Sequence, residues 1–90
     1  MPFKRDYGFD FDKIRKRVLA RDSHRCQICQ KKSRRLNIHH IRKWADNSYL
    51  RYDEDNLITL CIGCHRQIRG KEDQYISLFI TLVYQNKQNE

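Results

Sequence analysis

The cysteines and histidines of this chain are grouped in a way that suits metal binding. Its four cysteines form two Cys-x-x-Cys pairs, Cys26–Cys29 and Cys61–Cys64, and the second pair runs directly into His65. Four thiolates in two short pairs suit one tetrahedral ion, so we expect one structural Zn²⁺ there. The dipeptide His39-His40 lies between the pairs. Because neutral imidazole both ligates divalent metals and acts as a general base near neutral pH, these histidines are candidates for a second, catalytic site.

Paired cysteines also occur as disulfides, which are typical of secreted proteins. The first ten residues are charged and lack the apolar stretch of a secretion signal. We therefore expect zinc rather than disulfides, and a cytoplasmic location, either nucleoid-associated or in the cytoplasm of a host. No apolar run approaches the length of a membrane span.

The hydrophobic pattern predicts the elements that must position these side chains. Apolar residues recur at helical spacing from Asp10 to Arg21, and the other face of this helix is basic. A strand over residues 36–41 contains both adjacent histidines, whose side chains then point to opposite sides and should have different roles. We further expect a loop over 42–55, a strand over 56–60, a short helix from near Cys64 and a final helix over 74–87. The broad apolar face of the final helix either caps the core or forms a dimer interface.

Size and charge narrow the class of protein. Ninety residues form at most one domain, here 1–90, with a small core that needs a covalent or metal cross-link. The formal net charge is +8, from 19 Lys+Arg against 11 Asp+Glu. Such an excess indicates a polyanionic partner, most often a nucleic acid.

Five segments together resemble the HNH nucleases, the zinc-knuckled members of the ββα-metal (His-Me finger) group. These segments are Val18-Leu-Ala-Arg-Asp22, Cys26-x-x-Cys29, Leu36-Asn-Ile-His-His-Ile41, Asn56-Leu-Ile-Thr-Leu-Cys61 and Cys64-His65. The version most similar is the small free-standing kind found in phages and mobile elements. The resemblance covers about residues 14–73, leaving 1–9 as a basic arm, and implies an α+β fold with a zinc knot made by all four cysteines.

The resemblance also implies a role for each site residue. His40 corresponds to the general base that activates water, and His39 and His65 to ligands of a catalytic Mg²⁺, Mn²⁺, Ni²⁺ or Zn²⁺. Asn56 corresponds to the residue that holds the loop in shape and helps orient the base. A plain alternative for Asn56 is an asparagine opening a strand after a turn.

One position departs from many relatives, which carry a further histidine four residues after the closing one, on the same helical face. Here that position is Arg69. A guanidinium cannot ligate a cation. Either two histidines, water and DNA phosphate hold the ion while Arg69 clamps the phosphate, or the site is silent and the domain only binds DNA.

The sequence thus predicts a divalent-metal-dependent DNA endonuclease that acts as a monomer or homodimer. The alternatives are a catalytically silent zinc module and an accessory subunit of a phage packaging or restriction system, with a terminase or other protein partner. DNA backbone contacts are expected from a set of cations, namely Arg69, Arg42, Lys43, Arg15 and Arg17. In the loop, Trp44, Tyr49 and Tyr52 either touch DNA or pack in the core.

Overall fold

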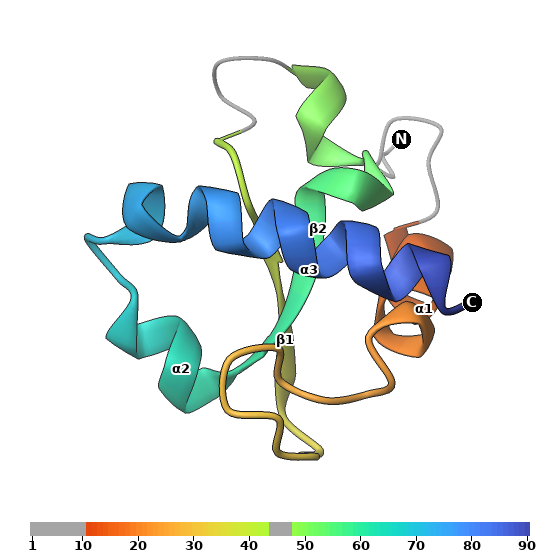
Figure 1. Ribbon diagram of the computed structural model, residues 1–90, viewed down its shortest axis with the longest axis horizontal. Helices are drawn as coiled ribbons and strands as arrows, with labels where there is room; N and C mark the ends of the chain where they lie inside the picture. The colour runs from red at the N-terminus through yellow and green to blue at the C-terminus, as the bar shows by residue number, and fades with distance from the viewer. Residues whose placement is uncertain (1–10, 44–47) are drawn as a thin grey trace, which may run out of the picture.

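A two-stranded antiparallel sheet lies at the centre of the fold, with helices on both of its faces (Figure 1). The computed structural model describes residues 11–43 and 48–90. In chain order the elements are α1 (Phe11–Arg21), β1 (Leu36–His40), the 3₁₀ turns η2 (Ser48–Arg51) and η3 (Glu54–Asn56), β2 (Leu57–Cys61), α2 (Ile62–Gln67), the 3₁₀ turn η4 (Glu72–Tyr75) and α3 (Ile76–Gln88). This arrangement confirms the predicted α+β class. The basic arm over 1–9 and Asp10, where the helical pattern begins, lie outside the described residues.

Several predicted boundaries differ from the observed ones. The strand β1 ends at His40 rather than residue 41, and β2 ends at Cys61 rather than residue 60. The second strand begins at Leu57, one residue late, because Asn56 still belongs to η3. The short helix begins at Ile62, before Cys64, since the Cys61 sulfur accepts the Cys64 N–H as an N-cap. The final helix begins at Ile76 rather than residue 74, because a 3₁₀ turn precedes it.

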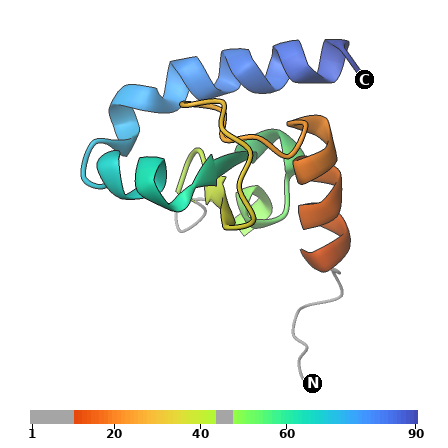
Figure 2. The ribbon, with the colours of Figure 1, turned by 90° about the horizontal axis from the view of Figure 1, so that it is seen from below.

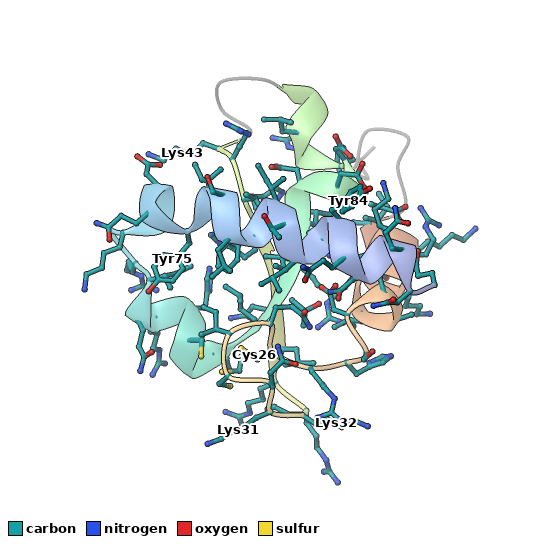
Figure 3. The ribbon with its side chains drawn as sticks, viewed as in Figure 1. Cys26, Lys31, Lys32, Lys43, Tyr75 and Tyr84 are labelled. Atoms are coloured by element: carbon teal, nitrogen blue, oxygen red, sulfur yellow. The ribbon has the colours of Figure 1, made fainter. Side chains whose placement is uncertain are left out.

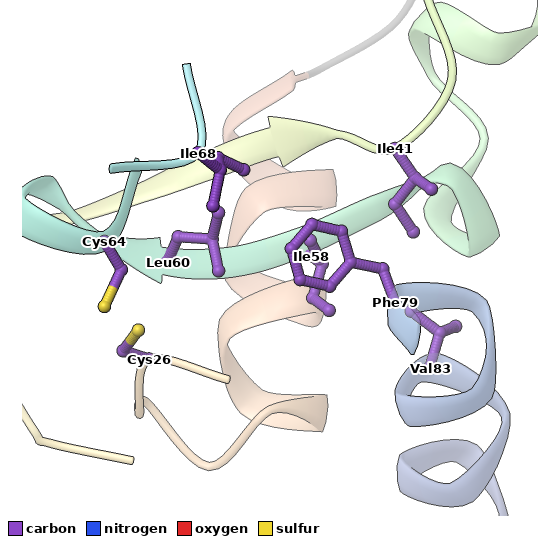
Figure 4. Packing of buried hydrophobic residues seen from close by; sticks show 8 residues of the cluster. All are labelled: Cys26, Ile41, Ile58, Leu60, Cys64, Ile68, Phe79 and Val83. Atoms are coloured by element: carbon purple, nitrogen blue, oxygen red, sulfur yellow. The ribbon is translucent and has the colours of Figure 1, made fainter. Parts of the chain in front are cut away.

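The strand β2 is buried on both faces of the sheet, which explains its nearly continuous apolar sequence. Leu57 packs with Ile14 and Val18 of α1 on one side. On the other side, Ile58 and Leu60 join the larger core cluster with Phe79 and Val83 of α3 (Figure 4). The apolar face of α3 therefore caps the core, the first of the two roles expected for it.

In Figure 2 the helix α3 runs along one side of the molecule, and α1 lies at the far end from α2. In the sheet, His39 and His40 pair with Ile58 and Leu57, respectively, so they face the α3 side and the α1 side. The register thus places the two adjacent histidines on opposite faces, as the strand period predicts.

A buried polar network around Asp22 joins three elements. Its carboxylate, in a residue only 2% exposed, accepts hydrogen bonds from the Arg21 guanidinium, the Thr59 N–H and the Asn86 amide at 2.8–3.0 Å. Through these bonds the end of α1, the strand β2 and the end of α3 share one anionic anchor.

Replacing Asp22 with alanine should lower the free energy of unfolding by about 3–5 kcal/mol, because it leaves the buried Arg21 charge and other donors unpaired. Urea denaturation measures this change. Asp12→Ala, at an exposed position in the first turn of α1, is the control and should cost less than about 1 kcal/mol. Equal losses for both variants would contradict an anchoring role of Asp22.

Candidate active site

The four cysteines come together in one cluster. Their sulfur atoms all lie within 4.8 Å of one another, and the Cys29 and Cys61 sulfurs are 3.9 Å apart. Two sulfurs bound to one tetrahedral zinc at about 2.3 Å would lie about 3.8 Å apart, whereas a disulfide needs about 2.0 Å. The cysteines are free thiols. The cluster therefore suits a structural metal ion, and its all-thiolate donor set favours zinc.

Backbone geometry prepares this cluster for a cation. The Ile28 N–H donates to the Cys26 sulfur at 3.4 Å, and the turn closes with the Gln30 N–H donating to the Cys26 carbonyl at 2.9 Å. Burial opposes ionisation of Cys26, but backbone N–H groups outweigh it and lower the pKa of this thiol to about 7. Burial raises the pKa of Cys64, and its neighbouring thiols raise it further. A bound divalent cation would supply the charge that keeps all four sulfurs deprotonated.

A cleft of about 450 Å³ lies between the sheet, α2 and the turn that follows it. Its lining includes all three predicted histidines. The residues that line it are Ile38, His39, His40, Ile41, Lys43, His65, Glu72 and Asp73. The His39 and His65 rings meet edge to face with centroids 5.3 Å apart, and Phe79 supports the His39 ring at 5.6 Å. The fold thus brings together the two residues predicted to hold a catalytic ion.

His39 is buried at 7% exposure, and among the described residues its Nε2 atom has no hydrogen-bond partner. Burial, reinforced by the charge of His65, lowers the pKa of His39 to about 4. The imidazole is therefore neutral at physiological pH, which is the form that binds a metal. A buried ring nitrogen without a partner on a cleft shared with a second imidazole fits a divalent cation.

This burial predicts a pH-dependent stability difference. The pKa of His39 is depressed in the folded state. The stability that the protein gains by burying the neutral ring is therefore present above pH 6.5 and is lost as the pH falls toward about 4. Without added divalent ions, lowering the pH from 7.5 to 5.5 should destabilise the wild type by about 1 kcal/mol more than His39→Gln. Urea denaturation of both proteins at the two pH values tests this, and parallel losses would contradict it.

His40 lies on the opposite face of β1 from His39 and is also among the residues that line the cleft. Its Nε2 lies 3.1 Å from the Arg51 carbonyl oxygen. Because a carbonyl can only accept, Nε2 must carry the hydrogen, and the neutral ring then has its lone pair on Nδ1. The contact therefore leaves Nδ1 able to accept a proton.

Asn56 closes the loop that carries the Arg51 carbonyl. Its side chain is 5% exposed, accepts the Arg42 N–H at 2.8 Å and donates to the Arg42 and Leu50 carbonyls at 3.0 Å. One amide thus joins both sides of the loop, and the residue next to Leu50 supplies the acceptor for His40. An asparagine that only opens a strand would not need to hold two segments of the loop together in this way.

The cations expected to contact DNA occupy different environments. Arg42 and Lys43 are exposed at the end of β1, and Lys43 lines the cleft. On α1, Arg15 donates to the Leu36 carbonyl at 3.0 Å and Arg17 forms an ion pair with Glu54, so both already have partners within the protein. Arg69 is exposed but is not among the residues that line the cleft.

The aromatic predictions have mixed outcomes. Tyr52 is half-buried and packs edge to face with Phe11, with ring centroids 6.3 Å apart, which favours a packing role. Trp44 and the side chain of Tyr49 lie outside the described part of the chain.

Sequence reasoning missed three polar residues near the histidines. Glu72 and Asp73 line the cleft from η4, and the Asn37 amide lies 3.4 Å from His65 Nδ1. Asn37 could have been found, because it lies two positions before His39 and thus faces the same side of β1. The two acids carry no comparable signal, since the turn that places them was not predicted.

Basic side chains also gather near the cysteine cluster. A second hollow of about 470 Å³ is lined partly by Lys31, Lys32, Arg35 and Arg66. Figure 3 shows Lys31 and Lys32 pointing outward beyond Cys26, whereas Lys43 lies at the other end of the molecule. Cations are therefore present at both ends of the fold.

The fold is a small α+β domain in which a short helix follows an antiparallel strand pair. Its cysteine cluster and its histidine cleft are suited to metal ions. The family model described as HNH endonuclease matches residues 26–71, which is more than half of the chain. The chain therefore belongs to the HNH endonuclease family, confirming the resemblance. Neither the curated proteins nor the solved structures gave a match. Membership indicates a nuclease or nucleic-acid-binding function.

Across the described ranges, no helix is both long enough and apolar enough to cross a lipid bilayer.

Proposed function

We propose that this protein is a divalent-metal-dependent DNA endonuclease that hydrolyses phosphodiester bonds. The observation that carries the proposal is the shared cleft of His39, His65 and His40, in which the hydrogen bond to the Arg51 carbonyl leaves His40 Nδ1 as a proton acceptor. Family membership supports the class of reaction.

His39 and His65 would hold the catalytic cation. His39 offers a buried, neutral imidazole whose Nε2 has no partner in the described part of the chain. The Asn37 side chain lies 3.4 Å from His65 Nδ1. For His65 to bind the cation through Nε2, Nδ1 would carry the hydrogen and donate it to the amide oxygen of Asn37. When bound, a divalent cation there would neutralise charge on the scissile phosphate and stabilise the leaving oxygen.

His40 would take a proton from the attacking water through Nδ1. The ring is held in the required tautomer by the Arg51 carbonyl, which continues to accept the Nε2 hydrogen after His40 becomes an imidazolium. Asn56 keeps that carbonyl in place by bonding both sides of the loop. His40 is the base in this mechanism, and Asn56 positions it.

DNA binding would rest mainly on contacts to the phosphate backbone. Lys43 and Arg42 beside the cleft and the cations at the cysteine end provide positive charge along the fold. Because Arg17 is neutralised by Glu54, we expect it to contribute less than Lys43.

A plasmid cleavage assay tests the proposal. Zinc-loaded protein is incubated with supercoiled plasmid and either EDTA or one of Mg²⁺, Mn²⁺ and Ni²⁺. Nicked or linear product should form with at least one ion and not with EDTA. The opposing hypothesis is a silent DNA-binding module, which Arg69 in place of a histidine favours. Protein that binds the plasmid but does not cut it with any ion would establish that module instead.

A further inference from the structure

Two segments that are distant in sequence line the hollow of about 470 Å³ beside the cysteine cluster. The turn after the first cysteine pair contributes Lys31, Lys32 and Arg35, and α2 contributes Arg66. The lining contains these four cations and no acidic residue, whereas the lining of the histidine cleft includes two acids. Positive charge therefore converges on this hollow from both segments.

None of the four cations forms an ion pair within residues 11–43 and 48–90. Other basic residues do, since Arg17 pairs with Glu54 and Lys87 pairs with Asp55. A cation without an internal partner keeps its charge for an anion outside the chain. The hollow is thus a positively charged surface that the protein itself does not neutralise.

The charge of the cysteine cluster explains part of this gathering of cations but not all of it. Four thiolates with one Zn²⁺ carry a net charge of −2, which attracts nearby cations. The four cations of the hollow exceed that charge by two. The hollow therefore keeps a positive surplus even when the cluster holds its metal ion.

The hollow also offers room and a neutral hydrogen-bond donor. On its lining, a Cβ added at Gly63 would meet no atom within 4 Å. Ser33 Oγ accepts the Arg35 N–H at 3.1 Å, so the hydroxyl hydrogen is left to donate. Lysine, arginine and serine side chains are the usual donors to the phosphate oxygens of DNA. The chemistry of the hollow therefore suits a phosphate group.

The hollow and the histidine cleft adjoin the same helix. His65 of α2 lines the cleft, and the next residue, Arg66, lines the hollow. The helix ends at Gln67, and the chain reverses at Gly70, whose φ of +83° is in the left-handed region that favours glycine. Arg69 therefore lies in the turn and not on the helical face of His65, which corrects the expectation drawn from the relatives. A polyanion that lies along α2 can contact both sites.

We propose that the hollow beside the cysteine cluster is an anchoring site for a second backbone phosphate of the DNA that the histidine cleft cuts. This inference rests on the function proposed above. The cations of the hollow hold the DNA equally before and during the reaction, because they do not touch the reacting atoms. They therefore contribute to the affinity for DNA, and hence to KM, but not to kcat.

Fluorescence anisotropy with a short DNA duplex and zinc-loaded protein, without added divalent ions, tests the proposal. Lys31→Gln/Arg66→Gln removes one cation from each segment of the hollow and should weaken binding about tenfold. The slope of log affinity against log salt should fall by about one to two. Lys16→Gln/Arg34→Gln is the matched control, because it removes a lysine and an arginine that are exposed but do not line the hollow. It should weaken binding by no more than about threefold.

The nicking rate and the zinc content separate this role from two others. With saturating plasmid and a divalent ion, Lys31→Gln/Arg66→Gln should nick at the wild-type rate. Equal losses of affinity in the two double variants would overturn the anchoring site and leave the proposed nuclease intact. Lower zinc content in Lys31→Gln/Arg66→Gln with unchanged DNA affinity would also overturn it, by assigning the cations to the thiolate cluster alone.

A measurement on the unsubstituted protein covers the case in which the variant does not fold. Titration with the same duplex should shift the backbone NMR signals of residues 31–35 and of Arg66. Unchanged signals there, while the duplex is bound, would overturn the proposal. A wild type that binds the duplex through the hollow but cuts DNA with no divalent ion would overturn the proposed nuclease and support the anchoring site as a DNA contact.

Discussion

Replacing His40 with glycine should lower the rate of plasmid nicking by about 10²–10⁴-fold, the range attributed to a positioned general base. The physical reason is the contact between His40 Nε2 and the Arg51 carbonyl, which leaves Nδ1 as the proton acceptor of the ring. The substitution creates space where the imidazole was. Added free imidazole should therefore restore part of the rate, and initial nicking rates with and without imidazole measure both effects.

His24→Ala is the control for this experiment, because His24 is an exposed histidine outside the cleft. Its nicking rate should match that of the wild type. Full activity of His40→Gly, with the same zinc content and DNA affinity as the wild type, would show that another group removes the proton.

Removing the metal from the cysteine cluster should abolish the folded state. Cys26 and Cys64 are part of the main hydrophobic core cluster with Phe79, so the metal knot and the core form one structure (Figure 4). Structural zinc in small domains contributes about 10–16 kcal/mol of apparent binding energy, comparable with or larger than a typical domain stability of about 5–15 kcal/mol. A strong chelator, or Cys64→Ser, should therefore eliminate cooperative thermal unfolding in circular dichroism.

Reversibility provides the control for chelation. Returning one equivalent of Zn²⁺ to the chelated protein should restore the spectrum and the unfolding transition, whereas Mg²⁺ should not, since thiolates favour soft metals. Chelated protein that unfolds at the same temperature as the untreated protein would contradict a structural role for the cysteine cluster.

The helical and strand segments could largely be predicted because their patterns are local. The apolar positions of α1 follow the helical period, and the continuous apolar sequence of β2 indicates a strand buried on both sides. The errors occur where a short-range hydrogen bond overrides that pattern. The Cys61 sulfur, for example, starts α2 before Cys64, and a 3₁₀ turn delays α3.

The pairing of His39 with His65 could be anticipated, because the strand order places both beside the cysteine pairs. The position of Glu72 at the cleft could not be anticipated, since it depends on the reversal at Gly70 rather than on a helical period. The anchor at Asp22 was missed for a similar reason. Its partners Thr59 and Asn86 are distant in sequence, and no periodicity connects them.

The central claim is that one cation in the histidine cleft supports phosphodiester cleavage. The most direct test measures plasmid nicking and Mn²⁺ binding on the same zinc-loaded protein over one range of Mn²⁺ concentration, with His65→Ala in parallel. Both quantities should saturate together in the wild type, with one Mn²⁺ per chain beyond the zinc, and both should be strongly reduced in His65→Ala. Cleavage that persists in EDTA, or one bound Mn²⁺ with no cleavage of bound DNA, would contradict the proposed nuclease.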